Sequence, residues 1–183
     1  MLWLKKGPSP HQTALAMIGA KSAGQVVVIG AGDGALAAEL ALVTGLNGRT
    51  LVVDRAEDAK TRIDVAAARA GALVDHERAP ATMLPLDTGT FDVAVINSVL
   101  DDAVSAANQI VGEAARVVRA GGRVVVINGA PRPGVLGLFN RSRTPQIESG
   151  VVRDLLNAAG LRGVRVLAEA EGVMFVEGTK GKS

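Results

Sequence analysis

The stretch VVVIGAGDGALAAELA, residues 26–41, joins an apolar run of strand length to three alternating glycines and then to a helical pattern. Glycine allows the backbone to turn sharply, and it lets a ligand approach where a Cβ atom would obstruct it. The helix that follows presents unpaired N–H groups at its first turn. A strand, a glycine loop and a helix in this order are typical of the ligand-binding edge of an α/β sheet.

Runs of strand length alternate with helical patterns through most of the chain. The predicted strands, which are apolar at consecutive positions, occupy residues 25–30, 49–54, 71–77, 91–97 and 122–128. Between them, apolar residues recur at the three- and four-residue spacing of helices. Alternating strands and helices, with strands apolar on both sides, predict a Rossmann-like α/β sandwich of three layers around a mostly parallel sheet.

The C-terminal part of the chain departs from this alternation. Residues 129–148 contain three prolines and three glycines, which predict a long loop on the substrate side. A further helix and two apolar stretches separated by a polar turn follow, and the stretches predict an antiparallel hairpin. We expect residues 1–183 to form a single domain, in which residues 1–24 are an N-terminal segment with a lid helix and residues 179–183 are a frayed tail.

Composition excludes several kinds of site. The chain has no cysteine, so disulfides, thiolate metal ligands and cysteine nucleophiles are absent. The two histidines, His11 and His76, lie far apart without ligand spacing, and no metal site is expected. Tyrosine is also absent, which rules out any mechanism that needs a tyrosine hydroxyl.

Charge and hydropathy predict a soluble protein. The formal net charge is +2, and the 20 basic residues are spread among 18 acidic ones, so no nucleic-acid partner is expected. No apolar run reaches the roughly 18 residues that a transmembrane segment requires. At the N-terminus, Lys5 and Lys6 follow the apolar stretch MLWL, which is the reverse of a signal peptide, so we expect a cytoplasmic location.

Asp54 ends the second predicted strand, 20 residues after Gly34. A carboxylate at this place can accept hydrogen bonds from both hydroxyls of a ribose, so the pair predicts an adenosine-containing ligand. Gly30, Gly32 and Ala35 also match the dinucleotide pattern G-x-G-x-x-G/A, which leaves a nicotinamide-dependent reductase as an alternative. The absent tyrosine and the short C-terminal remainder disfavour the two common kinds of such reductase. A purely structural role for the glycines and the acid is a third interpretation.

Four segments, in this order, resemble class I S-adenosylmethionine-dependent methyltransferases, in particular the type 11 subgroup with the ubiquinone and menaquinone biosynthesis enzymes. They are VVVIGAGDG (26–34), LVVD (51–54), APATMLPLDTGTFDVAVINSVLDD (79–102) and EAARVVRAGGRVVVI (113–127). The last two are the more specific. The resemblance covers nearly the whole chain from about residue 11, and it implies a seven-stranded sheet of order 3-2-1-4-5-7-6 with the last strand antiparallel.

The resemblance implies S-adenosylmethionine as the cofactor and ten residues that would contact it. Asp54 would bind the ribose hydroxyls, and Arg55 would flank the adenine. Ala81 and Thr82 would lie near the adenine edge, and Asn97 would face the methionine part and the methyl group. The N-terminus of the helix after the glycine loop would suit the carboxylate of the cofactor. The backbone along the methionine part would come from Gly30, Ala31, Gly32, Asp33 and Gly34.

Two positions depart from the pattern of this family. The family usually has an acid two residues before the first glycine, which holds the ammonium group of the cofactor, and an Asp before the LPL segment, which binds the adenine amino group. Here these positions are Val28 and Pro80. Each lost charge-assisted hydrogen bond would cost about 1.5–3 kcal/mol of binding free energy. A non-catalytic methyltransferase-like domain that binds or scaffolds is therefore the alternative to a methyltransferase.

The catalytic residues and the acceptor are less clearly marked. Transfer of a sulfonium methyl group depends chiefly on orientation, and a general base is needed only when the acceptor must lose a proton. The candidate bases are Asp101, which follows the fourth strand, and His11, in the predicted lid helix; the alternatives are a helix cap and a surface histidine. We expect a small-molecule acceptor. The apolar segments 1–4 and 135–139 would line its pocket or make peripheral membrane contact. No feature indicates the oligomeric state.

Overall fold

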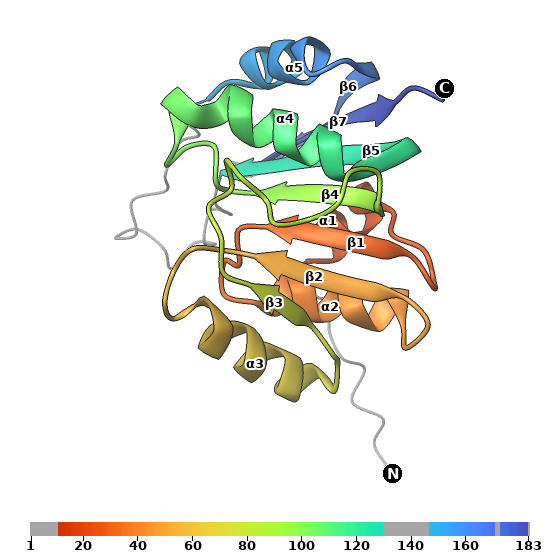
Figure 1. The fold of residues 1–183 in the computed structure, drawn as a ribbon, viewed down its shortest axis with the longest axis vertical. Coiled ribbons are helices and arrows are strands. Elements are labelled where there is room, and N and C mark those ends of the chain that lie inside the picture. The colour runs from red at the N-terminus through yellow and green to blue at the C-terminus, as the bar shows by residue number, and fades with distance from the viewer. Residues whose placement is uncertain (1–10, 130–146, 171–172, 183) are drawn as a thin grey trace.

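A seven-stranded sheet is the centre of the computed structural model, which describes residues 11–129, 147–170 and 173–182. The sheet has the order β3-β2-β1-β4-β5-β7-β6, which confirms the predicted topology (Figure 1). The five strands from β3 to β5 are parallel, and β7 is antiparallel to both of its neighbours. The strands are β1 (Gln25–Ile29), β2 (Arg49–Val53), β3 (Asp75–Glu77), β4 (Phe91–Asn97), β5 (Val118–Gly129), β6 (Leu161–Ala170) and β7 (Val173–Lys180).

Helices cover both faces of the sheet, so the fold is the predicted three-layer sandwich (Figure 1). The alternation of side chains along β1 explains why its sequence is continuously apolar. Val27 and Ile29 pack beneath one helical layer, whereas Val26 and Val28 pack beneath the other. The helices of the first layer are α4 (Ala107–Val117), preceded by the short helix η1 (Val104–Ala106), and α5 (Ser149–Ala158); those of the second are α1 (Gln12–Ile18), α2 (Ala35–Thr44) and α3 (Ala59–Ala70).

Three boundaries differ from the sequence prediction. The third strand begins at Asp75 rather than at residue 71, because Gly71 ends α3 in a left-handed conformation with φ +70°. The fifth begins at Val118, directly after α4, and its pairing with β4 is irregular at the start. The predicted frayed tail is wrong for residues 179 and 180, which belong to β7. The Lys180 ammonium group fixes this end of the strand, because it donates to carbonyl oxygens at the end of α4 and the start of β5.

Helix α1, the predicted lid helix, is part of the second core layer. Ile18 is fully buried, and Ala14 is buried beside it. The predicted substrate-side loop and the apolar segments 1–4 and 135–139 lie outside the described residues, apart from Gly129 and residues 147–148. Within the part of the chain that the structure describes, no helix is long and apolar enough to cross a membrane.

A buried carboxylate joins three strands and α1. Glu177 of β7 is 3% exposed, and its two carboxylate oxygens accept hydrogen bonds from Arg123 of β5 and Arg165 of β6, both at 2.7 Å. Arg123 also donates to the Ile18 carbonyl at the end of α1. The antiparallel side of the sheet is therefore connected to the N-terminal helix through one side chain.

Replacement of this carboxylate should destabilise the fold. In Glu177→Gln, we expect the free energy of unfolding to fall by about 1.5–3 kcal/mol, because one of the two guanidinium groups loses its buried acceptor. Arg49→Ala is the control: Arg49 pairs with Asp75 at the surface, the two side chains are 43% and 58% exposed, and the loss of this pair should cost less than about 1 kcal/mol. Urea unfolding followed by circular dichroism measures both. Equal losses in the two variants would contradict the role of the buried group.

Candidate functional site

A pocket of about 490 Å³ opens at the carboxyl ends of the central strands. The chain runs from β1 outward to β2 and β3 on one side and returns to β4 on the other side, so strand order reverses between β1 and β4. Ligand crevices of open α/β sheets lie at such a point. The walls come from the glycine loop, the end of β2, α3, residues 79–82, residues 97–99, residues 102–103 and the start of α4.

Six of the ten predicted cofactor residues line this pocket. The other four belong to the glycine loop, where they bond or pack within the protein, as described below. The six lining residues are Gly32, Asp54, Arg55, Ala81, Thr82 and Asn97. These six residues, which are far apart in sequence, are therefore brought together at one edge of the sheet.

Asp54 connects the end of β2 to the glycine loop. Its Oδ2 atom accepts a hydrogen bond from the Ala31 amide at 2.7 Å, and its Oδ1 atom accepts one from the Ala56 amide at 2.8 Å. Each carboxylate oxygen can accept a further hydrogen bond, so Asp54 can bind a hydroxyl group while it holds the loop. The sequence indicated the ligand-binding role, but not the connection to the loop.

Glycine is needed at the three positions of the loop for different structural reasons. A Cβ atom on Gly30 would lie 2.4 Å from the Val99 side chain, and one on Gly34 would lie 2.9 Å from backbone atoms of α3. These two glycines are required by packing. A Cβ atom on Gly32 would meet only the Asn97 amide nitrogen, at 3.2 Å, and Gly32 lines the pocket. Gly32 is therefore the position that keeps the loop open toward a ligand.

Comparison with protein families identifies this architecture. A family model described as "Methyltransferase domain" matches residues 27–126, more than half of the chain. The chain belongs to the methyltransferase-domain family. The match, together with the fold, places it in the class I S-adenosylmethionine-dependent superfamily and indicates S-adenosylmethionine as its cofactor. S-adenosylmethionine therefore takes the place of the nicotinamide cofactor that the glycine spacing had left as an alternative.

Solved structures share the fold of this methyltransferase domain at low sequence identity. A SAM-dependent methyltransferase from Aquifex aeolicus is 18% identical with a TM-score of 0.76, and the alignment covers 94% of each chain. One from Methanosarcina mazei is 17% identical with a TM-score of 0.65, over 87% of this chain and 93% of that one. The [4+2]-cyclase SpnF is 13% identical with a TM-score of 0.73, over 93% and 79% of the two chains. No match was found among curated proteins.

Two charged side chains bond to the backbone at the glycine loop and the start of α2. Asp33 Oδ1 accepts a hydrogen bond from the Ala35 amide at 3.0 Å, so the first turn of α2, where the cofactor carboxylate was expected, already has a protein anion beside it. Arg62 of α3, which the sequence analysis did not single out, lines the pocket and donates to the Gly32 carbonyl. Its i,i+4 pair with Asp58 is the only signal that the sequence offered, and such pairs are common on exposed helices.

Neither candidate base lines the pocket. Asp101 Oδ1 accepts hydrogen bonds from the Asn128 side-chain amide at 2.7 Å and from the Ile147 amide at 3.1 Å. His11 Nδ1 lies 3.2 Å from Glu39 Oε1, between α1 and α2. Asp102, the neighbour of Asp101, does line the pocket. Among the residues described, no group of three or more His, Asp or Glu side chains is placed to hold a metal ion.

The two departures from the family pattern have different surroundings. Val28 is 1% exposed and packs in the apolar layer beneath α1 and α2, so the core of this chain is built around an apolar side chain at that position. Pro80, in contrast, lines the pocket beside Ala81. A missing hydrogen bond at Pro80 can therefore be supplied by another residue of the pocket, whereas Val28 is integral to the core.

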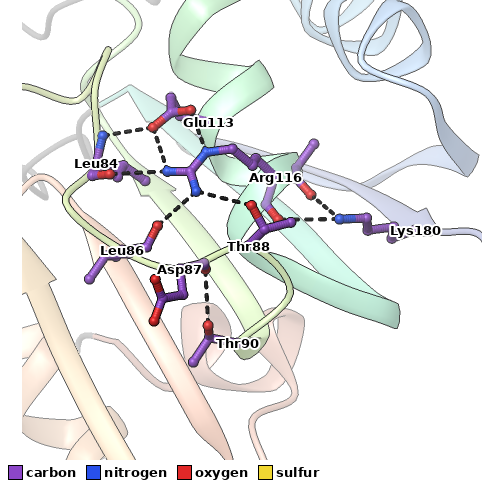
Figure 2. Close-up of polar contacts among 9 residues, drawn as sticks. Leu84, Leu86, Asp87, Thr88, Thr90, Glu113, Arg116 and Lys180 are labelled. Carbon is purple, nitrogen blue, oxygen red and sulfur yellow. Dashed lines mark hydrogen bonds and ion pairs between the residues drawn. The ribbon is translucent and has the colours of Figure 1, made fainter.

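An ion pair on α4 holds the segment that forms one wall of the pocket (Figure 2). Glu113 accepts a hydrogen bond from the Leu84 amide at 2.7 Å and pairs with Arg116 at 2.6 Å. Arg116 in turn donates to the Leu84 carbonyl at 3.0 Å and to the Leu86 carbonyl at 2.7 Å. The LPL and EAARVVR segments therefore contact each other directly, which explains physically why this methyltransferase domain contains both.

The ion pair should make stability depend on pH. The hydrogen bond from Arg116, opposed in part by burial, holds the pKa of Glu113 below its ordinary value of 4.5. A depressed folded-state pKa gives stabilisation that is complete above about pH 4.5 and is lost as the pH falls through the folded-state pKa. In Glu113→Gln, we expect a loss of about 1.5–3 kcal/mol of unfolding free energy at neutral pH and a weaker decline in acid.

Urea unfolding of the wild type and the variant between about pH 3 and pH 7 measures this difference. Asp64→Asn is the control, since Asp64 is 55% exposed and pairs with Lys60 on the surface of α3. A parallel decline of wild type and Glu113→Gln with acid would refute the assignment to Glu113.

The glycines should respond differently to alanine. Gly34→Ala introduces a backbone clash at φ +84° and should cost more than about 2 kcal/mol of stability. Gly32→Ala, at φ +56°, should cost about 1 kcal/mol of strain but lower the affinity for S-adenosylhomocysteine at least about tenfold, because the methyl group enters the pocket. Gly71→Ala, at φ +70° in the left-handed region and with open space around a Cβ atom, measures the strain alone. Thermal melts and titration calorimetry give the two quantities, and wild-type affinity in Gly32→Ala would be the contrary result.

Proposed function

We propose that this chain transfers the methyl group of S-adenosylmethionine to a small-molecule acceptor at the pocket between β1 and β4. Two neighbouring features support it most strongly. Asp54 accepts a hydrogen bond from the glycine loop at Ala31, and Gly32 leaves the loop open toward a ligand. Asp54 and Gly32 both line a pocket of cofactor size. When bound, the cofactor supplies an electrophilic methyl group on a sulfonium sulfur. The residues of the chain bind it, orient it and exclude water.

The pocket walls fit the parts of this cofactor. Asp54 has acceptor capacity left for the ribose hydroxyls, and the Gly32 backbone would lie along the methionine part. Arg55, Ala81 and Thr82 would surround the base, in a part of the pocket walled mainly by apolar side chains. Those apolar side chains belong to Ala79, Pro80, Ala81, Val99, Ala103, Ala106 and Ile110.

Asn97 would take over part of the role of the acid that is missing at position 28. Its side-chain amide nitrogen donates to the Gly30 carbonyl at 3.1 Å, which fixes the orientation of the amide. The amide oxygen then remains as an acceptor for the ammonium group of the cofactor. A neutral acceptor is weaker than a carboxylate, so we expect a lower affinity than an acid would give.

The proposed reaction needs no residue in the place of Asp101 or His11. A nucleophile that already carries an available lone pair can attack the methyl group in line without loss of a proton. Both residues instead have partners within the protein. His11 lies beside Glu39, and Asp101 accepts hydrogen bonds from Asn128 and Ile147. The apolar acceptor site, peripheral membrane contact and cytoplasmic location remain predictions from the sequence.

A second candidate function is ligand binding or scaffolding without methyl transfer. The observation that favours it is the apolar core around Val28, which has no acid for the ammonium group. The fold itself also hosts other chemistry, since SpnF, with a TM-score of 0.73, is a [4+2]-cyclase.

Titration calorimetry with S-adenosylmethionine, S-adenosylhomocysteine and NAD separates these functions. We expect micromolar binding of the first two and none of NAD. Asp54→Ala should weaken S-adenosylhomocysteine binding at least about a hundredfold, because the ribose acceptor and the anchor of the Ala31 amide are lost together. Asp154→Ala, an exposed acid on α5, is the control. Unchanged affinity in Asp54→Ala would refute the ribose assignment, and absence of binding by the wild type would refute the proposed reaction.

A further inference from the structure

A second pocket, of about 420 Å³, lies at the opposite end of β2 from the candidate functional site. It is lined by Arg49 and Thr50, at the start of β2, whereas Asp54 of the first pocket follows the other end of this strand. Its other walls come from the end of α2, the turn after that helix and residues 71–73. Among the described residues, the two pockets have no lining residue in common, so the second pocket has no part in the proposed reaction.

Three exposed leucines gather around the second pocket. They are Leu42 of α2, Leu46 in the turn after it and Leu73 before β3, and they are 55%, 88% and 77% exposed. A single exposed leucine is common on protein surfaces, whereas several around one pocket mark an interaction site. These three leucines are called the leucine patch below.

The first described residue of the chain lies beside the helix that carries part of this patch. His11 Nδ1 is 3.2 Å from Glu39 Oε1 on α2. Leu42 follows Glu39 by three residues, so the two lie on the same face of the helix. The helix continues from Glu39 to Thr44, which is about 7.5 Å of its axis. The chain therefore enters the described structure on the face of α2 that leads to the leucine patch.

The sequence before His11 has an apolar segment at a suitable spacing. Residues 1–4 are MLWL, and the six residues KKGPSP, 5–10, join them to His11. Six residues can span up to about 20 Å, which is more than twice the length of α2 beyond Glu39. Burial of leucine and tryptophan side chains against apolar surface is favourable. A tethered segment also binds at a smaller entropic cost than a second copy that arrives from solution.

We propose that residues 1–4 bind the leucine patch, with their apolar side chains packed against Leu42, Leu46 and Leu73. This inference does not depend on the proposed function. It places the segment 1–4 at the amino end of β2, rather than at the acceptor pocket or a membrane surface, which are the two locations considered from the sequence. The patch then has an occupant from its own chain, and its apolar surface is covered.

Trp3 is the single tryptophan of the chain, so its fluorescence reports this contact without a label. In the native protein, we expect blue-shifted emission and weaker quenching by acrylamide than in the urea-unfolded chain. Leu46→Asp and Leu73→Asp should each lower the equilibrium constant for docking at least about tenfold, because a charged side chain replaces apolar contact surface. Quenching of Trp3 should rise accordingly toward that of the unfolded chain.

Changes on the other side of the contact should have the same effect. Replacement of Leu2 and Leu4 by serine retains Trp3, and it should raise the quenching as Leu46→Asp does. Val151→Asp is the control, since Val151 is 49% exposed on α5, in the other helical layer. This variant should match the wild type. Thermal melts should show that all of the variants fold, because the substituted residues of the patch are exposed.

Three results would overturn the inference. The first is wild-type quenching, in buffer without lipid, that equals quenching of the unfolded chain. The second is protection of Trp3 that persists in both Leu46→Asp and Leu73→Asp. The third is protection that disappears on dilution of the protein, since this would assign the patch to a second copy of the chain.

Discussion

The pair between Glu113 and Arg116 determines the position of the segment that closes the pocket. Residues 78–90 connect β3 to β4 without a helix or strand of their own, and a loop of this kind has no internal ladder to hold its shape. The pair accepts one hydrogen bond from the backbone of that segment and donates two to it, and the segment therefore lies at a fixed place against α4. Because Lys180 bonds the carbonyls at the end of the same helix, the helix is in turn fixed to the last strand.

The glycine loop serves packing and ligand access at the same time. Gly30 and Gly34 allow the loop to contact β4 and α3 at distances that a side chain would forbid, and Gly32 alone is open to the pocket. Asp54 and Asn97 bond the loop from either side. A ligand would therefore meet a loop that is already organised, and it would lose less affinity to the ordering of the protein.

Much of this fold was predictable from the sequence, because strands buried on both faces leave an unmistakable continuous apolar pattern such as that of residues 26–29. The position of Asp54 at the pocket was equally accessible, because residues that end parallel strands lie at one edge of the sheet. That Asp102 lines the pocket and Asp101 does not was not accessible, because side-chain direction in an irregular segment follows no period. Arg62 was missed because its contact with Gly32 depends on how α3 packs. The length of the final strand was underestimated, because glycine and lysine at positions 178 and 180 are typical of an irregular tail. The acceptors that hold Lys180 lie in α4 and β5.

The carboxylate of Asp101 binds residues on either side of the stretch 130–146. One oxygen accepts from Asn128 at the end of β5 and from Ile147 before α5, so the two ends of the intervening 130–146 stretch are held next to each other by the scaffold itself. The entropy of closing a chain segment grows only with the logarithm of its length, at about 0.6 kcal/mol for each doubling. The length of this stretch can therefore change at little cost to the folding of the sheet.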